Sequence, residues 1–291
     1  MMTNQLEELC SILNEEPVPL LGEHQPNSLF KGSVGNALDE MFTHGRRYSN
    51  VPRTLRVSSL GKPVVDQMLP LLIGNDHPML VEEEFMFRQA MAIFTGHFIE
   101  AYAVKVAQEF DLDIHSMQLT VDYQDVMGHI DFIIDGYVVD VKSMSDGYYS
   151  AFSRKPNNDR GYITQASVYS EALGLPFAWL LFNSAKRVWS VKYLNSYDKK
   201  DALDRVDRVL PKMRSCVTLS DLLSMFKAPE PIAEVFRKEE TGKFILPTSM
   251  FFSNYKHIWY EVLDGINSYN KKQSYVINRR TADEVIQLLS S

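Results

Sequence analysis

The chain has 291 residues, a net charge of −7 and no apolar run of the roughly 18 residues that a membrane-spanning helix needs. The acidic balance argues against a protein that coats nucleic acid non-specifically, but it allows an enzyme with a local basic groove and an acidic metal site. Two cysteines, Cys10 and Cys216, are too few for a four-cysteine cluster, and the first residues show no secretory signal. We therefore expect a cytoplasmic protein with no membrane partner and no iron–sulfur cluster.

Helix and strand signals alternate along the chain. In order, they are a helix followed by an irregular arm at 1–35, short helices at 36–45 and 60–73, a long helix at 82–110, three strands at 117–123, 128–134 and 137–143, a loop at 146–160, a helix at 161–173, a hairpin at 177–183 and 187–194, and a helix at 199–226. A PEP turn at 229–231 precedes a mainly helical remainder. The order helix, three strands, helix, two strands predicts an α/β fold with a mixed sheet.

Asp135-Gly136 lies between two strand-like segments and predicts a tight hairpin, because both positions of a two-residue turn need positive φ. Residues that face each other across this turn have numbers that sum to 271. The facing pairs are then Ile134 with Tyr137, Asp131 with Asp140, and His129 with Lys142. Asp131, Asp140 and Lys142 would share one face of the hairpin, while Ile130, Phe132, Ile134, Val139 and Val141 would face the core.

The two facing carboxylates need compensation, because like charges directly opposite each other destabilise a sheet. A divalent cation compensates best, since Mg²⁺ binds through one or two carboxylates and keeps waters and phosphate oxygens as further ligands. The alternative is a half-exposed hairpin whose acids face water or form a salt bridge with Lys142. The three charged residues in register on one face favour the metal site over this alternative.

Three motifs occur in the order and spacing of a nuclease superfamily. Asp131 and the Asp140-Val141-Lys142 triplet resemble the PD-(D/E)XK nuclease signature. Residues 95–100 (TGHFIE) resemble the helix motif that ends in a metal-binding Glu in lambda-exonuclease-like and RecB-like members, and 165–169 (QASVY) resembles the QxxxY motif of the RecB-like branch. Residues 56–61 (RVSSLG) more weakly resemble the serine-bearing entry segment of that branch.

The resemblance covers about residues 56–195 and implies a PD-(D/E)XK restriction-endonuclease-like core, a mixed central sheet flanked by helices, with helical N- and C-terminal additions. We divide the chain into an N-terminal helical arm at 1–55, the nuclease core at 56–226 and a mainly helical C-terminal appendage at 227–291. In iron–sulfur members a cysteine follows the serine segment, whereas Lys62-Pro63 follows it here. The chain therefore resembles cluster-free members, such as phage exonucleases and the mitochondrial genome maintenance exonuclease.

The resemblance also implies roles for individual residues. The implied ligands of Mg²⁺, for which Mn²⁺ can substitute, are Glu100, Asp131, Asp140, the Val141 carbonyl and, less firmly, His97. Lys142 would position the attacking water or stabilise charge that develops on the phosphate. Gln165 and Tyr169 lie four residues apart on one helix face and complete the catalytic set with hydrogen bonds, and the Tyr ring could stack on a base. The alternative for this pair is an ordinary amphipathic helix with a half-buried Tyr.

Further contacts with DNA are expected around this set. The candidates are Ser58, Ser59, Ser143, Arg154, Lys155 and Arg160, together with Gln165 and Tyr169. Basic residues in the loop before the QxxxY helix would contact phosphates and make binding sensitive to salt. The alternatives are a solvated charged loop for these basic residues and a capping role for Ser143.

The motifs together predict a metal-dependent DNA exonuclease that hydrolyses phosphodiester bonds in single-stranded DNA or at DNA ends, in phage-type recombination, repair or DNA degradation. A structure-specific or restriction-like endonuclease is one alternative, and a catalytically inactive DNA-binding module is another. No GxxxxGK[ST] loop occurs, so no use of ATP is expected. A separate helicase or annealing protein is left open as a partner, and a phage-encoded chain would act in the host cytoplasm.

Overall fold

The structure is a computed structural model and describes residues 4–15, 55–62, 67–68, 71–72, 83–154, 160–218, 221, 236–238, 243–246, 266–270 and 274–277. The chain divides into two compact units. The first comprises Met1–Arg47, Arg56–Gly61 and Glu83–Leu203, and the second comprises Tyr48–Leu55, Lys62–Glu82 and Asp204–Ser291. No helix in the described segments is long and apolar enough to cross a lipid bilayer.

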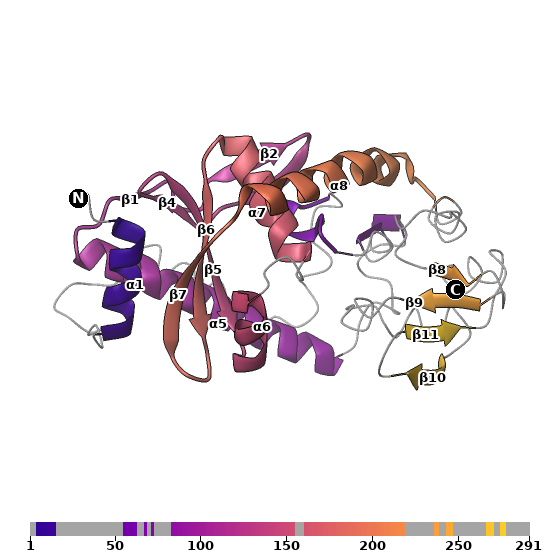
Figure 1. Cartoon of the computed structure of the whole chain (residues 1–291), viewed down its shortest axis with the longest axis horizontal. Coiled ribbons are helices and arrows are strands. Elements are labelled where there is room, and N and C mark those ends of the chain that lie inside the picture. Colours follow the sequence, from indigo (N-terminus) through magenta and orange to yellow (C-terminus); the bar gives the residue numbers. More distant parts are fainter. Residues whose placement is uncertain are drawn as a thin grey trace. The chain divides into compact units, whose positions relative to one another are not determined.

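A five-stranded mixed sheet forms the centre of the first unit (Figure 1). Its strands, in spatial order, are β1 (Ile114–His115), β4 (Phe132–Ile134), β5 (Tyr137–Met144), β6 (Phe177–Asn183) and β7 (Val188–Tyr193). The β5–β6 pair is parallel and the other pairs are antiparallel. The parallel pair needs a long crossover, which the chain makes through α6 (Asp146–Arg154) and α7 (Arg160–Leu173). The predicted α/β fold with a mixed central sheet is confirmed.

Helices cover both faces of this sheet. On one face lie α1 (Gln5–Glu15) and α5 (Glu83–Glu109), and on the other lie α6 and α7. Alternate residues of β6 show the division, because Leu180 packs in the cluster with α1 and α5 whereas Trp179 contacts Phe152 of α6. The hairpin of β4 and β5 is therefore buried on both faces and is not the half-exposed hairpin that the sequence left open.

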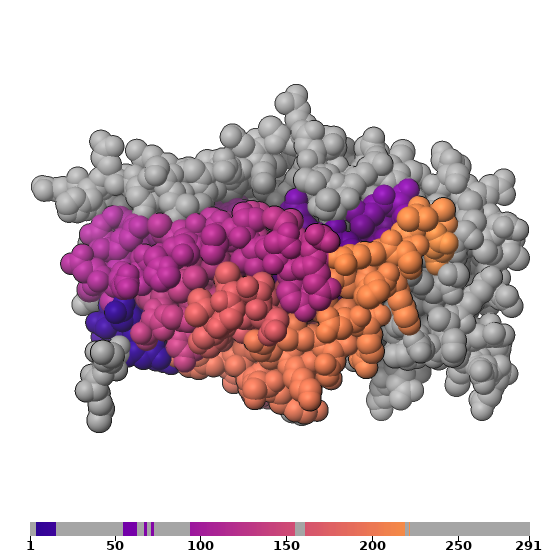
Figure 2. All heavy atoms as spheres, turned by 90° about the horizontal axis from the view of Figure 1, so that it is seen from above, coloured from indigo at the N-terminus to yellow at the C-terminus, as the bar shows by residue number. Residues whose placement is uncertain are grey.

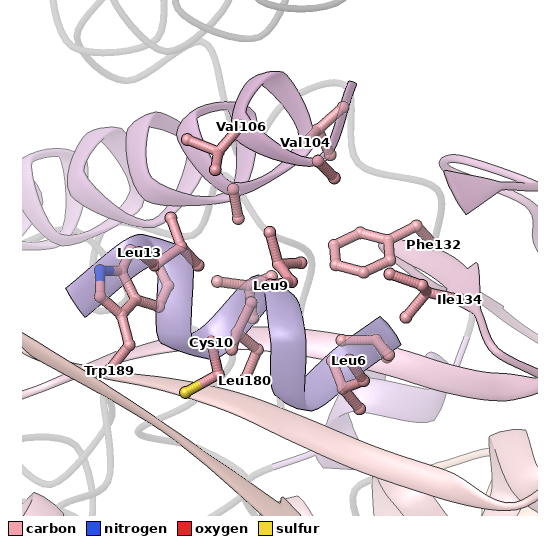
Figure 3. Close-up of a cluster of buried hydrophobic side chains, with 14 of the residues drawn as sticks. Leu6, Leu9, Cys10, Leu13, Val104, Val106, Phe132, Ile134, Leu180 and Trp189 are labelled. Carbon is pink, nitrogen blue, oxygen red and sulfur yellow. The ribbon is translucent and has the colours of Figure 1, made fainter. Parts of the chain in front are cut away.

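The helix α1 is a layer of the core (Figure 3). The buried cluster around it consists of Leu6, Leu9, Cys10 and Leu13 of α1, Val104 and Val106 of α5, and Phe132, Ile134, Leu180 and Trp189 of the sheet, with smaller neighbours. The side chain of Asn14 also pairs with the backbone of Trp189 in the edge strand β7, accepting at 2.8 Å and donating at 3.1 Å. This pairing satisfies backbone groups that an exposed edge strand would otherwise present.

Replacing Leu9 by alanine is expected to lower the free energy of unfolding by about 2–5 kcal/mol, because it removes a fully buried side chain from this cluster. Urea unfolding followed by circular dichroism measures the change. The control is Glu8→Ala, an exposed neighbour on the same helix, for which we expect a change within about 0.5 kcal/mol. Equal unfolding midpoints for the two variants would mean that α1 does not contribute to the stability of the core.

The Asp135-Gly136 turn forms as predicted. Both residues have positive φ, 55° for Asp135 and 74° for Gly136. The ladder between β4 and β5 pairs Phe132 with Val139, Ile133 with Val138, and Ile134 with Tyr137. This is the predicted register, and it brings Asp131 next to Asp140 where the ladder ends.

The strand predicted at 117–123 begins three residues later than predicted, and the one predicted at 128–134 is interrupted at Ile130 and Asp131. The observed strands are β2 (Thr120–Tyr123), β3 (Val126–His129) and β4, and β2 pairs with β3 in a separate two-stranded sheet. The backbone at Ser116 and Gln118 has φ values of 54° and 54°, which an extended strand cannot adopt. The segment before β2 is therefore irregular, and β4 is shorter than predicted.

The segment predicted as a loop at 146–160 is helical as far as Arg154, in α6. Phe152 is buried there and lies edge-on to Trp179 and Tyr162, so tertiary packing rather than local propensity stabilises this helix. The helix predicted at 199–226 begins earlier, as α8 (Ser196–Ser215), and it also ends earlier, because residues 216–218 are not helical. The predicted helix at 36–45 lies outside the described residues. Of the one at 60–73, the described residues 67–68 and 71–72 are helical, whereas 60–62 form a turn and a bend, so the prediction is wrong at its start.

The second unit contains a four-stranded antiparallel sheet in the order β10 (Ile266–Asn270), β11 (Ser274–Ile277), β9 (Lys243–Leu246) and β8 (Phe236–Lys238). These strands lie where the sequence predicts a mainly helical appendage, so that prediction is wrong for the described residues of this region. Short runs rich in aromatic and β-branched residues, such as 243–246 (KFIL) and 274–277 (SYVI), are typical of strands, and they carry the signal that was missed.

Candidate active site

Three carboxylates and one ammonium of the first unit interact through their charges, and they come from three parts of the chain. Asp131 occupies the short link between β3 and β4, and Asp140 and Lys142 lie two residues apart on β5. Glu100 comes from α5. Asp140 is 2% exposed and Glu100 is 9% exposed, so the site places two charged groups in the interior.

Two short contacts hold the sheet residues of the site together. The Asp131 carboxylate accepts a hydrogen bond from the backbone N–H of Val141 at 2.6 Å, which fixes its side chain against the next strand. The Lys142 ammonium lies 2.6 Å from Oδ2 of Asp140. The predicted grouping of Asp131, Asp140 and Lys142 is therefore observed, with the salt bridge that the alternative interpretation proposed.

The two aspartates of the site resist ionisation. Burial raises the pKa of Asp131 well above its ordinary range, and the charges of Glu100 and Asp140 raise it further. Burial also raises the pKa of Asp140, although the neighbouring Lys142 opposes this shift. Both shifts arise because negative charges are close together and shielded from water.

Lys142 stays protonated at neutral pH. Burial alone would lower the pKa of its ammonium, but the charges of Asp140 and Asp131 outweigh this effect and raise the pKa above its ordinary value. The ammonium also lies 5.4 Å from the centre of the Tyr162 ring, within the range of a cation–π contact. Lys142 can therefore donate hydrogen bonds and positive charge, but it cannot act as a general base.

Glu100 is held by two neighbours. Its Oε1 accepts a hydrogen bond from the side-chain amide of Gln118. Its Oε2 lies 3.8 Å from Nδ1 of His97, one helical turn earlier on α5. His97 thus lies on the same side of α5 as Glu100, and its role as a ligand stays a prediction.

The residues of the site fit a divalent cation by their chemistry. Glu100, Asp131 and Asp140 supply hard oxygen donors, and three carboxylates against one ammonium leave an excess of negative charge. In the part of the chain that the structure describes, no group of three or more His, Cys, Asp or Glu side chains is gathered closely enough to hold a metal ion. Each acid is instead held by the amide of Gln118, the N–H of Val141 or the ammonium of Lys142.

Tyr169 and Gln165 connect α7 to the site. Tyr169 is 2% exposed and its ring stacks on Phe177, so it has no free face for a nucleotide base, contrary to that part of the prediction. Its hydroxyl accepts a hydrogen bond from the backbone N–H of His129 at 3.1 Å and another contact from Gln165. Burial raises the pKa of Tyr169 to about 12, so the hydroxyl is neutral.

His129 pairs with Thr120 in the two-stranded sheet and not with Lys142, so that predicted pair is wrong. The cause is the same interruption of the strand, which places β3 and β5 in different sheets. The hydrogen bond from His129 to Tyr169 joins β3 to α7. Figure 2 shows the molecule from above, where magenta atoms from the middle of the chain adjoin the salmon atoms of α7.

The predicted serine-bearing segment lies beside α7. Residues Val57–Ser59 form a single 3-10 turn, η1, which packs against α7 and β3. Ser58 is exposed and Ser59 is half-buried. The segment is therefore close to the helix of Gln165 and Tyr169, and contacts of both serines with DNA stay predictions.

The basic residues proposed for phosphate contacts are placed only in part. Arg154 is exposed at the end of α6, where its Nε donates to the carbonyl of Ser150 at 2.9 Å. Arg160 begins α7, and Lys155 lies outside the described residues. Ser143 is half-buried on β5, next to Lys142.

Two residues at the site were not predicted from the sequence. Tyr162 precedes Gln165 by three residues and Tyr169 by seven, which places all three on one helix face, and this spacing could have revealed it. Gln118 gave no such signal, because its contact with Glu100 joins parts of the chain that lie in different elements.

The first unit is thus a mixed α/β structure in which two buried acids, one half-buried acid and one half-buried lysine lie beside a central hairpin. No family model matches the sequence, and the search of curated proteins found no match. Among solved structures, the chain is similar to an alkaline exonuclease from Laribacter hongkongensis, with a TM-score of 0.36, 10% identity, and coverage of 59% of this chain and 97% of that chain. It is also similar to a phage-related exonuclease from Haemophilus somnus 129PT, with a TM-score of 0.37, 14% identity, and coverage of 60% and 96%.

Proposed function

We propose that the chain is a metal-dependent deoxyribonuclease of the PD-(D/E)XK type. The observation that carries the proposal is the arrangement of Asp131, Asp140 and Lys142 across two strands, with Glu100 close enough for its charge to raise the pKa of both aspartates. A buried excess of carboxylate charge is costly unless a cation or protons compensate it. A divalent cation that compensates these carboxylates could also bind the phosphate of a phosphodiester. The site is therefore suited to phosphodiester hydrolysis.

A bound Mg²⁺ would act as a Lewis acid toward the phosphate and would lower the pKa of a bound water. Glu100, Asp131 and Asp140 would hold the ion through their carboxylate oxygens, with the Val141 carbonyl and His97 as further candidates. The hydrogen bond from Val141 N–H and the burial of Asp140 fix both carboxylates before substrate binds. Fixed groups need little reorganisation when the reaction occurs, which favours the transition state.

Lys142 would hold the attacking water or an oxygen of the scissile phosphate. Because its ammonium keeps its proton, it donates rather than accepts, and it counters the negative charge that grows on the phosphate. Tyr162 would limit the positions of this ammonium through its ring. Gln165 and Tyr169 act one step away, since they fix the end of β3 from which Asp131 follows.

The finer proposal is an exonuclease that degrades single-stranded DNA or DNA ends in phage-type recombination, repair or DNA degradation. DNA is then the binding partner, and Mn²⁺ is expected to substitute for Mg²⁺ because both accept carboxylate ligands. The basic residues near the end of α6 would contact backbone phosphates.

The test is cleavage of end-labelled single- and double-stranded DNA with and without Mg²⁺. We expect Asp140→Asn to lower the cleavage rate by more than about 100-fold, because the variant loses a metal ligand and the partner of Lys142. The control is Asp122→Asn, an exposed aspartate of β2, which should cleave like the wild type. Undiminished Mg²⁺-dependent cleavage by Asp140→Asn would refute the proposed site.

Two further measurements separate the alternatives. A circular single-stranded substrate stays intact with an exonuclease and is cut by an endonuclease. An inactive DNA-binding module would cleave nothing, and Mg²⁺ or Mn²⁺ would not raise its melting temperature.

A further inference from the structure

Gln118 contacts two of the residues proposed to hold the metal ion, Glu100 and Asp131. Its side-chain amide donates to Oε1 of Glu100 on α5. Its backbone N–H donates to the carbonyl oxygen of Asp131 at 3.0 Å. One residue therefore links the helix that carries one acid to the sheet segment that carries another.

The position of Gln118 follows from the register of the two-stranded sheet. Thr120 pairs with His129 and Val121 pairs with Gly128, and the same register, continued two residues outward, sets Gln118 opposite Asp131. Asp131 is also the residue at which the chain leaves this hairpin for the next one. A link from Gln118 to Asp131 thus fixes the junction between the two hairpins.

The backbone of Gln118 is unusual for its residue type. Its φ of 54° lies in the left-handed region, which residues other than Gly adopt rarely and Asn, Asp and His adopt most often among the rest. Such conformations persist where surrounding structure demands them, and they cluster at functional sites. Gln118 is exposed, so packing of its side chain in the core does not explain why its backbone keeps this left-handed conformation.

We infer that Gln118 is a positioning residue, which sets the Glu100 carboxylate relative to Asp131 so that both can bind one divalent cation. The inference rests on the proposed function and goes beyond it, because Gln118 belongs to none of the motifs that suggested that function. A neutral amide suits this role: it donates to the carboxylate without adding a charge that would compete with the cation. Partners that orient ligands in this way typically change metal affinity or activity by 10- to 100-fold when removed.

The test is Gln118→Met, which keeps an unbranched side chain of similar length and removes the amide. We expect the Mn²⁺ or Mg²⁺ concentration that gives half of the rise in melting temperature to increase by about 10- to 100-fold. At saturating metal, the cleavage rate should return to within a few-fold of the wild type, because the residue does not touch substrate. The melting temperature without metal should stay near that of the wild type.

Gln124→Met is the matched control. Gln124 is an exposed glutamine with a φ of 50°, in the turn between β2 and β3, so it shares the residue type and the backbone conformation but not the contact with Glu100. Its metal response should equal that of the wild type. A Glu100→Gln background supplies a double-mutant cycle, in which Gln118→Met should add little further loss of metal affinity.

The outcomes distinguish the two proposals. If the wild type is stabilised by metal and cleaves DNA, but Gln118→Met responds to metal like the wild type, the inference about Gln118 is overturned and the proposed function stands. An equal loss in the wild-type and Glu100→Gln backgrounds also overturns it, because the effect would then not act through Glu100. A wild type that neither binds metal nor cleaves DNA overturns both.

Discussion

Replacing Lys142 by methionine is expected to lower the rate of Mg²⁺-dependent DNA cleavage by about 100- to 1000-fold, the usual effect of removing one group that stabilises charge in a transition state. Methionine keeps most of the length of the side chain and removes the charge that lies 2.6 Å from Asp140. The measurement is the initial rate of product release from end-labelled DNA at saturating Mg²⁺. Lys105→Met is the control, because Lys105 pairs with Glu109 on α5, outside the site.

The same variant should separate catalysis from metal binding. Without Lys142, the carboxylates of Asp140 and Asp131 have lost their nearest positive charge, so a divalent cation gains importance for the fold. We expect Mg²⁺ to raise the melting temperature of Lys142→Met by at least as much as it raises that of the wild type. A variant that loses both cleavage and the response to metal would contradict the proposed role, since Lys142 would then be needed to assemble the site.

The stability of the metal-free variant should depend on pH in a defined direction. Because the folded state raises the pKa of Lys142, the ammonium stabilises the fold at all pH values below its unfolded pKa. The lysine side chain is 20% exposed, so its loss should cost about 3 kcal/mol at pH 7, the lower end for breaking a buried pair. This cost should shrink as pH falls, because Asp131 and Asp140 have raised pKa values and take up protons before ordinary aspartates do. Urea unfolding at several pH values with a chelator present measures it.

Local chemistry explains which parts of the site could be predicted. Two residues with positive φ define a hairpin turn, and a two-residue turn allows one register, so Asp135-Gly136 sufficed to place Asp131 beside Asp140. The spacing of two residues along β5 then placed Lys142 on the same side. These relations span few residues and depend on backbone geometry alone.

The parts that were not predicted depend on contacts between distant segments. The helix α6 begins with Asp146-Gly147 and carries two tyrosines, a weak helical sequence, and it is stabilised by Phe152 against Trp179 of the sheet. The irregular backbone at Gln118, just before β2, was likewise not predicted, because glutamine is not a typical turn residue. Its left-handed backbone is tied to Asp131 across the hairpin and to Glu100 on the long helix.

Replacing Gly128 by alanine is expected to destabilise the protein by about 1–3 kcal/mol, the usual cost of overpacking. A Cβ at this position would lie 2.6 Å from the hydroxyl oxygen and 2.7 Å from Cε1 of Tyr169, and 2.9 Å from Cβ of Val57. Neither neighbour can give way easily, because Tyr169 is 2% exposed and Val57 is fully buried. Urea unfolding followed by tryptophan fluorescence measures the change.

The control is Gly96→Ala, because a Cβ there meets nothing within 4 Å and alanine favours the helix interior by about 0.5–1 kcal/mol. A second comparison tests the cause. In a Tyr169→Phe background the nearest contact, with the hydroxyl oxygen, is gone while the contact with Cε1 remains, so Gly128→Ala should cost less there than in the wild type. Equal costs in the two backgrounds would mean that β3 does not lie against the Tyr169 hydroxyl. The hydrogen bond from His129 N–H, through which α7 fixes the strand that leads into Asp131, would then have to be abandoned as well.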